Sequence, residues 1–309
     1  MKITRKLTVF LLLVTCYGCA VLTESQVKLV NGLAVAGDSV AAAPSVLFKE
    51  LAAVRTERGL LYAASLTGAQ ARYHEINALA QAAADDEKLG PKTDVYVTAL
   101  NSYLRALRSI SHPDRWKQHG TRMRAMGRNL DSLLLTFNSL DWLEEDIPMG
   151  IAKLSGKYVG YLSESYMKTR QAQAVKEFVT AGDTLVSQCV DALVVLLKKE
   201  AVNELIINEQ EGLQDNYLAY LQRVENSGQL PPLENDRVYL QLKGNLAAAT
   251  KVRDRCVTGL QSLKRAHNKL LKELETRQTA THSNQELIEL NTIALEVQTL
   301  LNLLKVETP

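Results

Sequence analysis

The sequence predicts an all-α fold, an elongated antiparallel helical bundle with coiled-coil-like helices. Aromatic residues make up only 6% of its 309 residues, and alanine and leucine are abundant. Alanine and leucine are the best helix formers, whereas strands favour aromatic and β-branched residues. Apolar residues recur at steps of three and four over long stretches, and no stretch alternates apolar and polar residues between hairpin turns. We therefore expect essentially no sheet.

The first helical region is expected to begin close to Thr23. Thr23 and Gln26, three residues apart, are typical of a capping box, in which each side chain bonds the other residue's backbone N–H. We expect this region to continue to about residue 88. A break or kink is expected between Gly37 and Pro44, and a stop is expected where proline follows glycine at residues 90–91, because both residue types interrupt helices.

Two apolar stripes follow, and the turn-forming residues 111–114 lie between them. Their steps of three and four predict coiled-coil-like helices. The first stripe contains Val97, Leu100, Leu104 and Leu107, and the second contains Met123, Met126, Leu130, Leu133, Phe137 and Leu140. Pro148 ends this part, so we divide the chain beyond its leader into residues 19–148 and residues 149–309, two regions that could also be continuous.

The second region opens with a very long helical pattern, residues 149–226. Unbroken, it would extend about 117 Å, so we expect a bend near Gly182 or Gly212. Glycine and proline within residues 227–232 predict the next turn. Two seams complete the chain, and Ser283 with Glu286 suggests a capping box between them. They comprise Val252, Cys256, Leu260, Leu263, His267, Leu270 and Leu274, then Leu287, Leu290, Ala294, Val297, Leu301 and Leu304.

The first residues have the pattern of a secretory signal peptide. Three basic residues precede the apolar run of residues 7–14, which is too short to span a bilayer as a helix. The run leads to Cys16 and then to Gly18-Cys19, and a small residue directly before a cysteine resembles the lipobox of bacterial lipoproteins. The resemblance covers only this segment. It implies that residues 1–18 are a signal peptide that is cleaved.

The same resemblance implies a lipid anchor of acyl chains, such as palmitate, on Cys19. Cys16 is the alternative, since it restores Leu13 three residues earlier but puts Thr15 at the cleavage point. Several acyl chains hold a protein firmly on a membrane. In Gram-negative lipoproteins, Asp after the lipidated cysteine resembles a signal for retention in the inner membrane. Here Ala20 follows Cys19, which resembles the pattern for sorting to the outer membrane. The expected location is therefore the outer membrane of a bacterial envelope, facing the periplasm.

The mature chain is nearly neutral. Cleavage removes three of the 36 Lys and Arg residues, which leaves 33 against 34 Asp and Glu, so nothing favours nucleic acid as a partner. Two cysteines remain beyond the signal segment, Cys189 and Cys256. Because an exported protein meets an oxidising environment, we expect them to form a disulfide. The alternative is two free, buried thiols.

The sequence lacks the motifs of the common enzyme classes. Its five histidines are scattered, with no spacing that sets metal ligands on one face of a helix. We expect His267, on a seam, to be packed and hydrogen-bonded. No nucleophile elbow, phosphate-binding loop or dinucleotide fingerprint occurs. We therefore expect no catalytic residues, no metal, no cofactor and no enzyme activity.

One segment is rich in basic residues and contains a single acid, Asp114. It could bind anionic lipid headgroups or an acidic partner, because each cation near a charged surface contributes about 1 kcal/mol. The alternative is a solvated face whose cations pair with acids of neighbouring helices. The candidate residues are Arg105, Arg108, Arg115, Trp116, Lys117, Arg122, Arg124 and Arg128.

A second candidate contact is Arg58. Glu57-Arg58-Gly59 within a long helical pattern resembles a motif of the helical nitrate- and nitrite-sensing domains of bacterial receptors. The resemblance covers about a dozen residues and implies that Arg58 contacts a bound anion. The alternative is an arginine that pairs with a carboxylate one helical turn away.

These observations favour a membrane-anchored lipoprotein that acts as a non-enzymatic structural or adaptor component of a bacterial envelope assembly. Its expected partners are the lipid bilayer, through the N-terminal acyl chains, and a protein of the envelope. A homo-oligomer is also compatible with the seams. The alternatives are a periplasmic-face sensor or binding protein for a small anion, and a membrane-active helical protein whose alanine-rich residues 34–84 rearrange into lipid.

Overall fold

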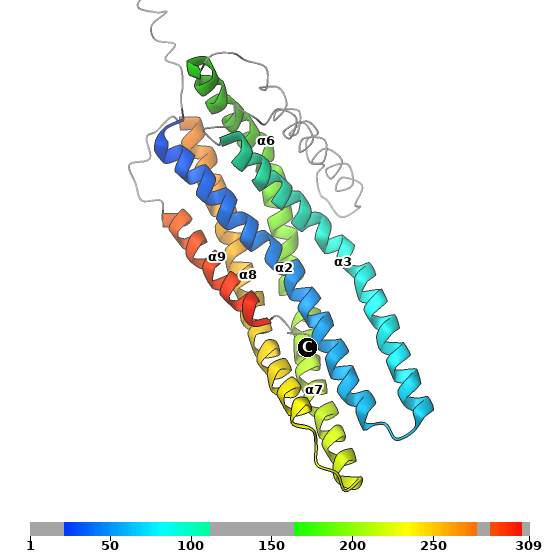
Figure 1. The fold of residues 1–309 in the computed structure, drawn as a ribbon. Coiled ribbons are helices and arrows are strands. Elements are labelled where there is room, and N and C mark those ends of the chain that lie inside the picture. Colours follow the sequence, from blue (N-terminus) through cyan, green and yellow to red (C-terminus); the bar gives the residue numbers. More distant parts are fainter. Residues whose placement is uncertain (1–21, 112–163, 277–284, 305–309) are drawn as a thin grey trace, which may run out of the picture.

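The protein is an elongated all-α bundle (Figure 1). The computed structural model describes residues 22–111, 164–276 and 285–304, and no strand occurs within these ranges. The helices are α2 (Glu24–Ser65), α3 (Ala69–Ser111), α6 (Glu164–Lys198), α7 (Glu200–Asn226), α8 (Leu233–Thr276) and α9 (Gln285–Leu304). The predicted fold class is confirmed.

Helices α2 and α3 run in opposite directions, α6 and α7 run in the same direction one after the other, and α8 runs back, so the bundle has two ends (Figure 1). At the Thr23 end, α2 and α9 begin and α3 and α8 finish. At the Leu230 end, residues 66–68 join α2 to α3 and residues 227–232 join α7 to α8. The predicted turn at residues 227–232 is therefore confirmed. The predicted capping box is confirmed too, because Thr23 Oγ1 accepts from the N–H of Gln26 at 3.2 Å and Gln26 Oε1 accepts from that of Thr23 at 3.0 Å.

Helix α2 lies at the centre and packs against α3, α7, α8 and α9. A single cluster of buried apolar side chains draws on all the helices named above. The regions before and after residue 148 therefore share one core, although Pro148 itself lies outside the described residues.

Two predicted interruptions near the N-terminus are wrong. Helix α2 continues through Gly37 and Pro44, and α3 continues through residues 90–91. The chain turns instead at residues 66–68, inside a stretch predicted to be helical. A proline within a helix removes one backbone hydrogen bond, and packing in the core can offset that loss. Pro44 is itself buried within α2.

The bend predicted at Gly182 or Gly212 is also in the wrong place. Both glycines lie inside helices, and the break falls at Lys199, whose ψ of 137° is extended. The glycines serve close packing instead. A Cβ atom on Gly182 would lie 2.1 Å from the Tyr103 ring, and one on Gly212 would lie 2.3 Å from the Arg58 guanidinium.

The predicted disulfide is absent, because Cys189 and Cys256 are free, buried thiols. On the antiparallel helices α6 and α8, Asp191 faces Lys264. Cys189 lies two residues before Asp191, whereas Cys256 lies eight residues before Lys264. Because the helices are antiparallel, these offsets add to roughly 15 Å along the helix axis, and the contact between Asp183 and His267 gives a register in which the offset is roughly 8 Å. A disulfide needs Cα atoms roughly 4–7 Å apart. Burial raises the pKa of both thiols, that of Cys256 to about 12.

We predict that Gly182→Ala destabilises the bundle although alanine is the better helix former. The added Cβ would overlap the ring of Tyr103, which is fully buried. Overpacking a core costs about 1–3 kcal/mol, more than the gain in helix propensity of about 1 kcal/mol. Gly244→Ala is the matched control, because nothing lies within 4 Å of its added Cβ. Urea denaturation should show a lower midpoint for Gly182→Ala and an equal or higher one for Gly244→Ala.

Candidate functional site

Arg58 belongs to a cluster of charged side chains between α2 and α7. Its Nε donates to Glu209 Oε2 at 2.9 Å, and Arg55 Nε donates to Glu209 Oε1 at 2.9 Å. The Glu209 side chain is only 4% exposed. Asn216 Nδ2 donates to the carbonyl oxygen of Arg58 at 3.2 Å. The cluster thus ties α2 to α7 through one carboxylate that two arginines share.

This arrangement differs from the pairing considered from the sequence. The carboxylate that meets Arg58 comes from another helix, 151 residues later, and not from the next turn of α2. No pattern in the sequence indicates that contact. An anion at Arg58 would have to compete with Glu209 for the guanidinium, and removing Glu209 would leave the partly buried arginines without their carboxylate.

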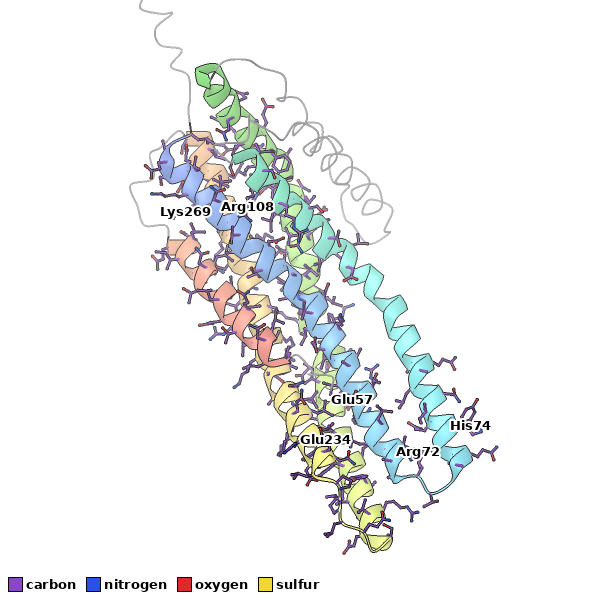
Figure 2. The ribbon with its side chains drawn as sticks, in the orientation of Figure 1. Glu57, Arg72, His74, Arg108, Glu234 and Lys269 are labelled. Carbon is purple, nitrogen blue, oxygen red and sulfur yellow. The ribbon has the colours of Figure 1, made fainter. Side chains whose placement is uncertain are left out.

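The structure describes only two residues of the predicted basic segment. Arg105 Nε donates to Asp38 Oδ1 on α2 at 3.2 Å, and both side chains are exposed. Arg108 is exposed near the Thr23 end (Figure 2). Exposed pairs of this kind contribute about 0–1 kcal/mol, so Arg105 is available to other anions. Outside the described residues lie Arg115, Trp116, Lys117, Arg122, Arg124 and Arg128, together with Cys16 and Cys19.

A fully buried polar contact joins Tyr103 of α3 to His267 of α8. Tyr103 Oη and His267 Nε2 are 2.8 Å apart, and His267 Nδ1 lies 3.3 Å from Asp183 Oδ1 on α6. His267 is thus packed and hydrogen-bonded, as predicted. Burial raises the pKa of Tyr103, and the contact with His267 lowers the pKa of Asp183.

A tyrosine, a histidine and an aspartate in series could pass a proton, but this series has no access for a substrate. Phe178 stacks on the Tyr103 ring, with centroids 5.0 Å apart, and Tyr103 and His267 are both fully buried. Only Asp183 reaches solvent. The contacts therefore position three helices against one another, a role that sequence reasoning missed because the partners are far apart in the chain.

An open hollow of about 540 Å³ lies beside the break between α6 and α7. Arg253, its most strongly basic residue, already donates to Asn203 Oδ1 at 2.6 Å and to Asp254 Oδ1 at 2.9 Å. The lining mixes both signs of charge and favours no single ligand class. It consists of Leu197, Lys198, Glu200, Asn203, Arg253, Asp254 and Val257.

The Leu230 end exposes large apolar side chains. Leu230 is 91% exposed, Tyr73 is 65% exposed and Leu233 is 63% exposed. Figure 2 shows Arg72 and His74 beside the turn that follows α2, and Glu234 near the turn that joins α7 to α8. The two turns at this end of the bundle thus each expose large apolar side chains.

Two further features bear on function. Within the described ranges, no three His, Cys, Asp or Glu residues are placed to hold a metal ion. Three described segments are long and apolar enough to cross a membrane by length and composition, namely Glu24–Ser65, Gln171–Lys198 and Gln285–Leu304. In the bundle, more than half of the apolar stretch in α2 is buried against other helices.

We predict that Glu209→Gln destabilises the chain by about 2 kcal/mol, because two partly buried arginines lose their shared carboxylate. Glu289→Gln is the matched control. It removes an exposed pair, in which Arg265 Nη2 and Glu289 Oε1 are 2.6 Å apart, and should change stability by less than about 1 kcal/mol. If urea denaturation showed the same loss of stability for both variants, the α2–α7 cluster would stabilise the bundle no more than an exposed ion pair does.

We also predict an acid-dependent effect of Asp183→Asn. Because the folded-state pKa of Asp183 is lowered, its stabilisation is present above the unfolded pKa of about 3.9 and is lost as pH falls through the folded pKa. The variant should be less stable than the wild type near neutral pH, and the difference should vanish in strong acid. Urea midpoints measured across this pH range test this, and a gap that widens in acid would contradict it.

Comparisons of the chain with protein-family models, with curated protein sequences and with solved structures give no significant match. Its function therefore has to be inferred from its own residues and contacts.

Proposed function

We propose that the chain is a lipid-anchored, non-enzymatic adaptor of a bacterial envelope assembly, which holds a protein-docking end away from its membrane. The observation that carries this proposal is the separation of the two ends by the central helix. Helix α2 has 42 residues and so spans about 63 Å. The chain enters the bundle at one end of α2, and exposed apolar side chains lie near the other.

The anchor would hold the Thr23 end close to the lipid. Cys19 precedes Thr23 by four residues, which can extend at most about 14 Å. The capping box then starts α2 at once. Lipidation at Cys16 would lengthen the tether by three residues and leave the same end nearest the membrane.

The docking end would be formed by the two turns at the opposite end of the bundle. Tyr73 and Ile76 lie close to the turn that follows α2, and Leu230 and Leu233 lie in and beside the turn that follows α7. Burying a large apolar side chain contributes about 1.5–3 kcal/mol. Burying two or three of these side chains would therefore supply a large part of the binding free energy of a partner.

The pairing within two polar clusters supports an adaptor over a sensor that binds an anion at Arg58 or an enzyme that uses Tyr103 and His267. Tyr103 is bonded to His267, and Glu209 is held by Arg58 and Arg55. Binding of a small anion at Arg58 would have to open the α2–α7 cluster. The membrane-active alternative has support from the three apolar segments, and it would require α2 to leave the core that it organises.

We expect a photocrosslinking residue at Tyr73 to capture a specific envelope protein in cells at native expression. The same residue at Ile288, which is 62% exposed on α9 toward the Thr23 end, is the matched control and should not capture that protein. Wild type should sediment with the outer membrane, whereas Cys19→Ala should be released and lose the crosslink.

Two results would overturn the proposal. Equal capture at Tyr73 and Ile288 would show that the partner does not bind specifically at the Leu230 end. Unchanged fractionation of both Cys19→Ala and Cys16→Ala would show that neither cysteine carries a lipid anchor. Leakage of lipid vesicles caused by the non-lipidated chain would favour the membrane-active alternative instead.

A further inference from the structure

We propose that residues 227–233, the Leu230 loop, form a preorganised docking peptide that binds a groove with two apolar pockets on a partner protein. The inference rests on the proposed adaptor function and names the chemistry of its partner. The loop has the sequence Ser-Gly-Gln-Leu-Pro-Pro-Leu. Leu230 is the most exposed large apolar side chain among the described residues.

The first half of the loop is fixed by a helix-ending motif. The N–H of Gly228 donates to the carbonyl of Glu225 at 2.9 Å, and that of Gln229 donates to the carbonyl of Val224 at 3.3 Å. This pair of bonds is a Schellman motif, which needs a left-handed residue. Gly228 supplies it, with φ of 66°. Ser227 Oγ adds a bond to the carbonyl of Val224 at 2.6 Å.

The second half is stiffened by its prolines. The rings fix φ of Pro231 and Pro232, and a residue that precedes a proline is confined to extended backbone. Leu230 and Pro231 both precede a proline, so the segment is biased toward polyproline II. In that conformation residues three apart share a face and lie about 9 Å apart. Leu230 and Leu233, the first residue of α8, are three apart on either side of the prolines, a spacing that fits two neighbouring pockets.

The base of the loop, where α7 ends and α8 begins, is held together by contacts between the two helices. Tyr217 of α7 stacks on Tyr239 of α8, with ring centroids 4.0 Å apart and planes 10° apart. The Tyr217 hydroxyl also hydrogen-bonds Asp236. Because the loop and its base are ordered before binding, little conformational entropy remains to be lost when a partner covers the leucines. Preformed polyproline II segments bind aromatic-lined grooves for the same reason.

The charges near the loop favour a protein partner with a basic rim. Glu225, Glu234 and Asp236 outnumber the flanking Arg223 and Arg237, so residues 223–237 carry a formal charge of −1. Arg237 pairs with Glu234 at 3.6 Å, just beyond the loop. An anionic membrane surface attracts basic segments, so it would not be drawn to this one. The groove is therefore expected to be apolar at its floor, with Lys or Arg at its edge.

The test begins with a photocrosslinking residue at Gln229 in the whole chain expressed in cells, followed by identification of the captured protein. That protein is then purified, and its affinity is measured for wild type, Leu230→Arg and Leu233→Arg. We expect each variant to bind at least tenfold more weakly, and the wild-type affinity to fall as salt is raised. Leu295→Arg, at a leucine 66% exposed on α9, is the matched control and should bind like the wild type.

Misfolding can be separated from loss of binding. Because Leu230 is 91% exposed, Leu230→Arg should unfold at the same urea concentration as the wild type. Full capture by the Tyr73 probe in Leu230→Arg, with unchanged affinity, would overturn the loop proposal and leave the adaptor intact. Capture of lipid or of a second copy at Gln229 would also overturn it. Absence of any protein captured from Tyr73 and from Gln229 would overturn both proposals.

Discussion

The close approach of other side chains to the glycines of α2 is the constraint on which the bundle depends. A Cβ on Gly37 would lie 2.8 Å from Leu263 and 2.9 Å from Leu104, and one on Gly59 would lie 2.2 Å from Leu79. The missing side chains leave room for leucines from α3 and α8, so one helix can contact four neighbours. The Gly59 of the Glu57-Arg58-Gly59 motif thus has a packing role of its own.

Local patterns predicted three features correctly. The all-α class, the start of α2 and the turn at residues 227–232 depend on neighbours in sequence, and all three are confirmed. The helix interruptions predicted at glycines are wrong, because glycine can either break a helix or let a neighbouring helix approach closely. At Gly37 and Gly182 it admits a leucine or a tyrosine ring from another helix, and a single sequence does not distinguish that purpose from a bend.

The candidate site could be predicted less well, because its contacts join distant parts of the chain. The packed state of His267 followed from its place on a seam, but its partner Tyr103 lies 164 residues away. Arg58 was predicted as a candidate contact from its neighbours in sequence, whereas the carboxylate that pairs with it belongs to Glu209 on α7. The docking proposal depends on exposure, which the residue types of the Leu230 loop do not reveal without the fold.

The two buried thiols bear on how the chain matures. A thiol reacts as its thiolate, and a raised pKa together with burial keeps Cys189 and Cys256 unreactive once the helices have assembled. In an oxidising compartment, such a chain reaches its final state without a disulfide isomerase, provided that α6 and α8 associate faster than an oxidant attacks. For a chain exported as proposed above, the order of helix association and oxidation would decide whether both thiols stay free.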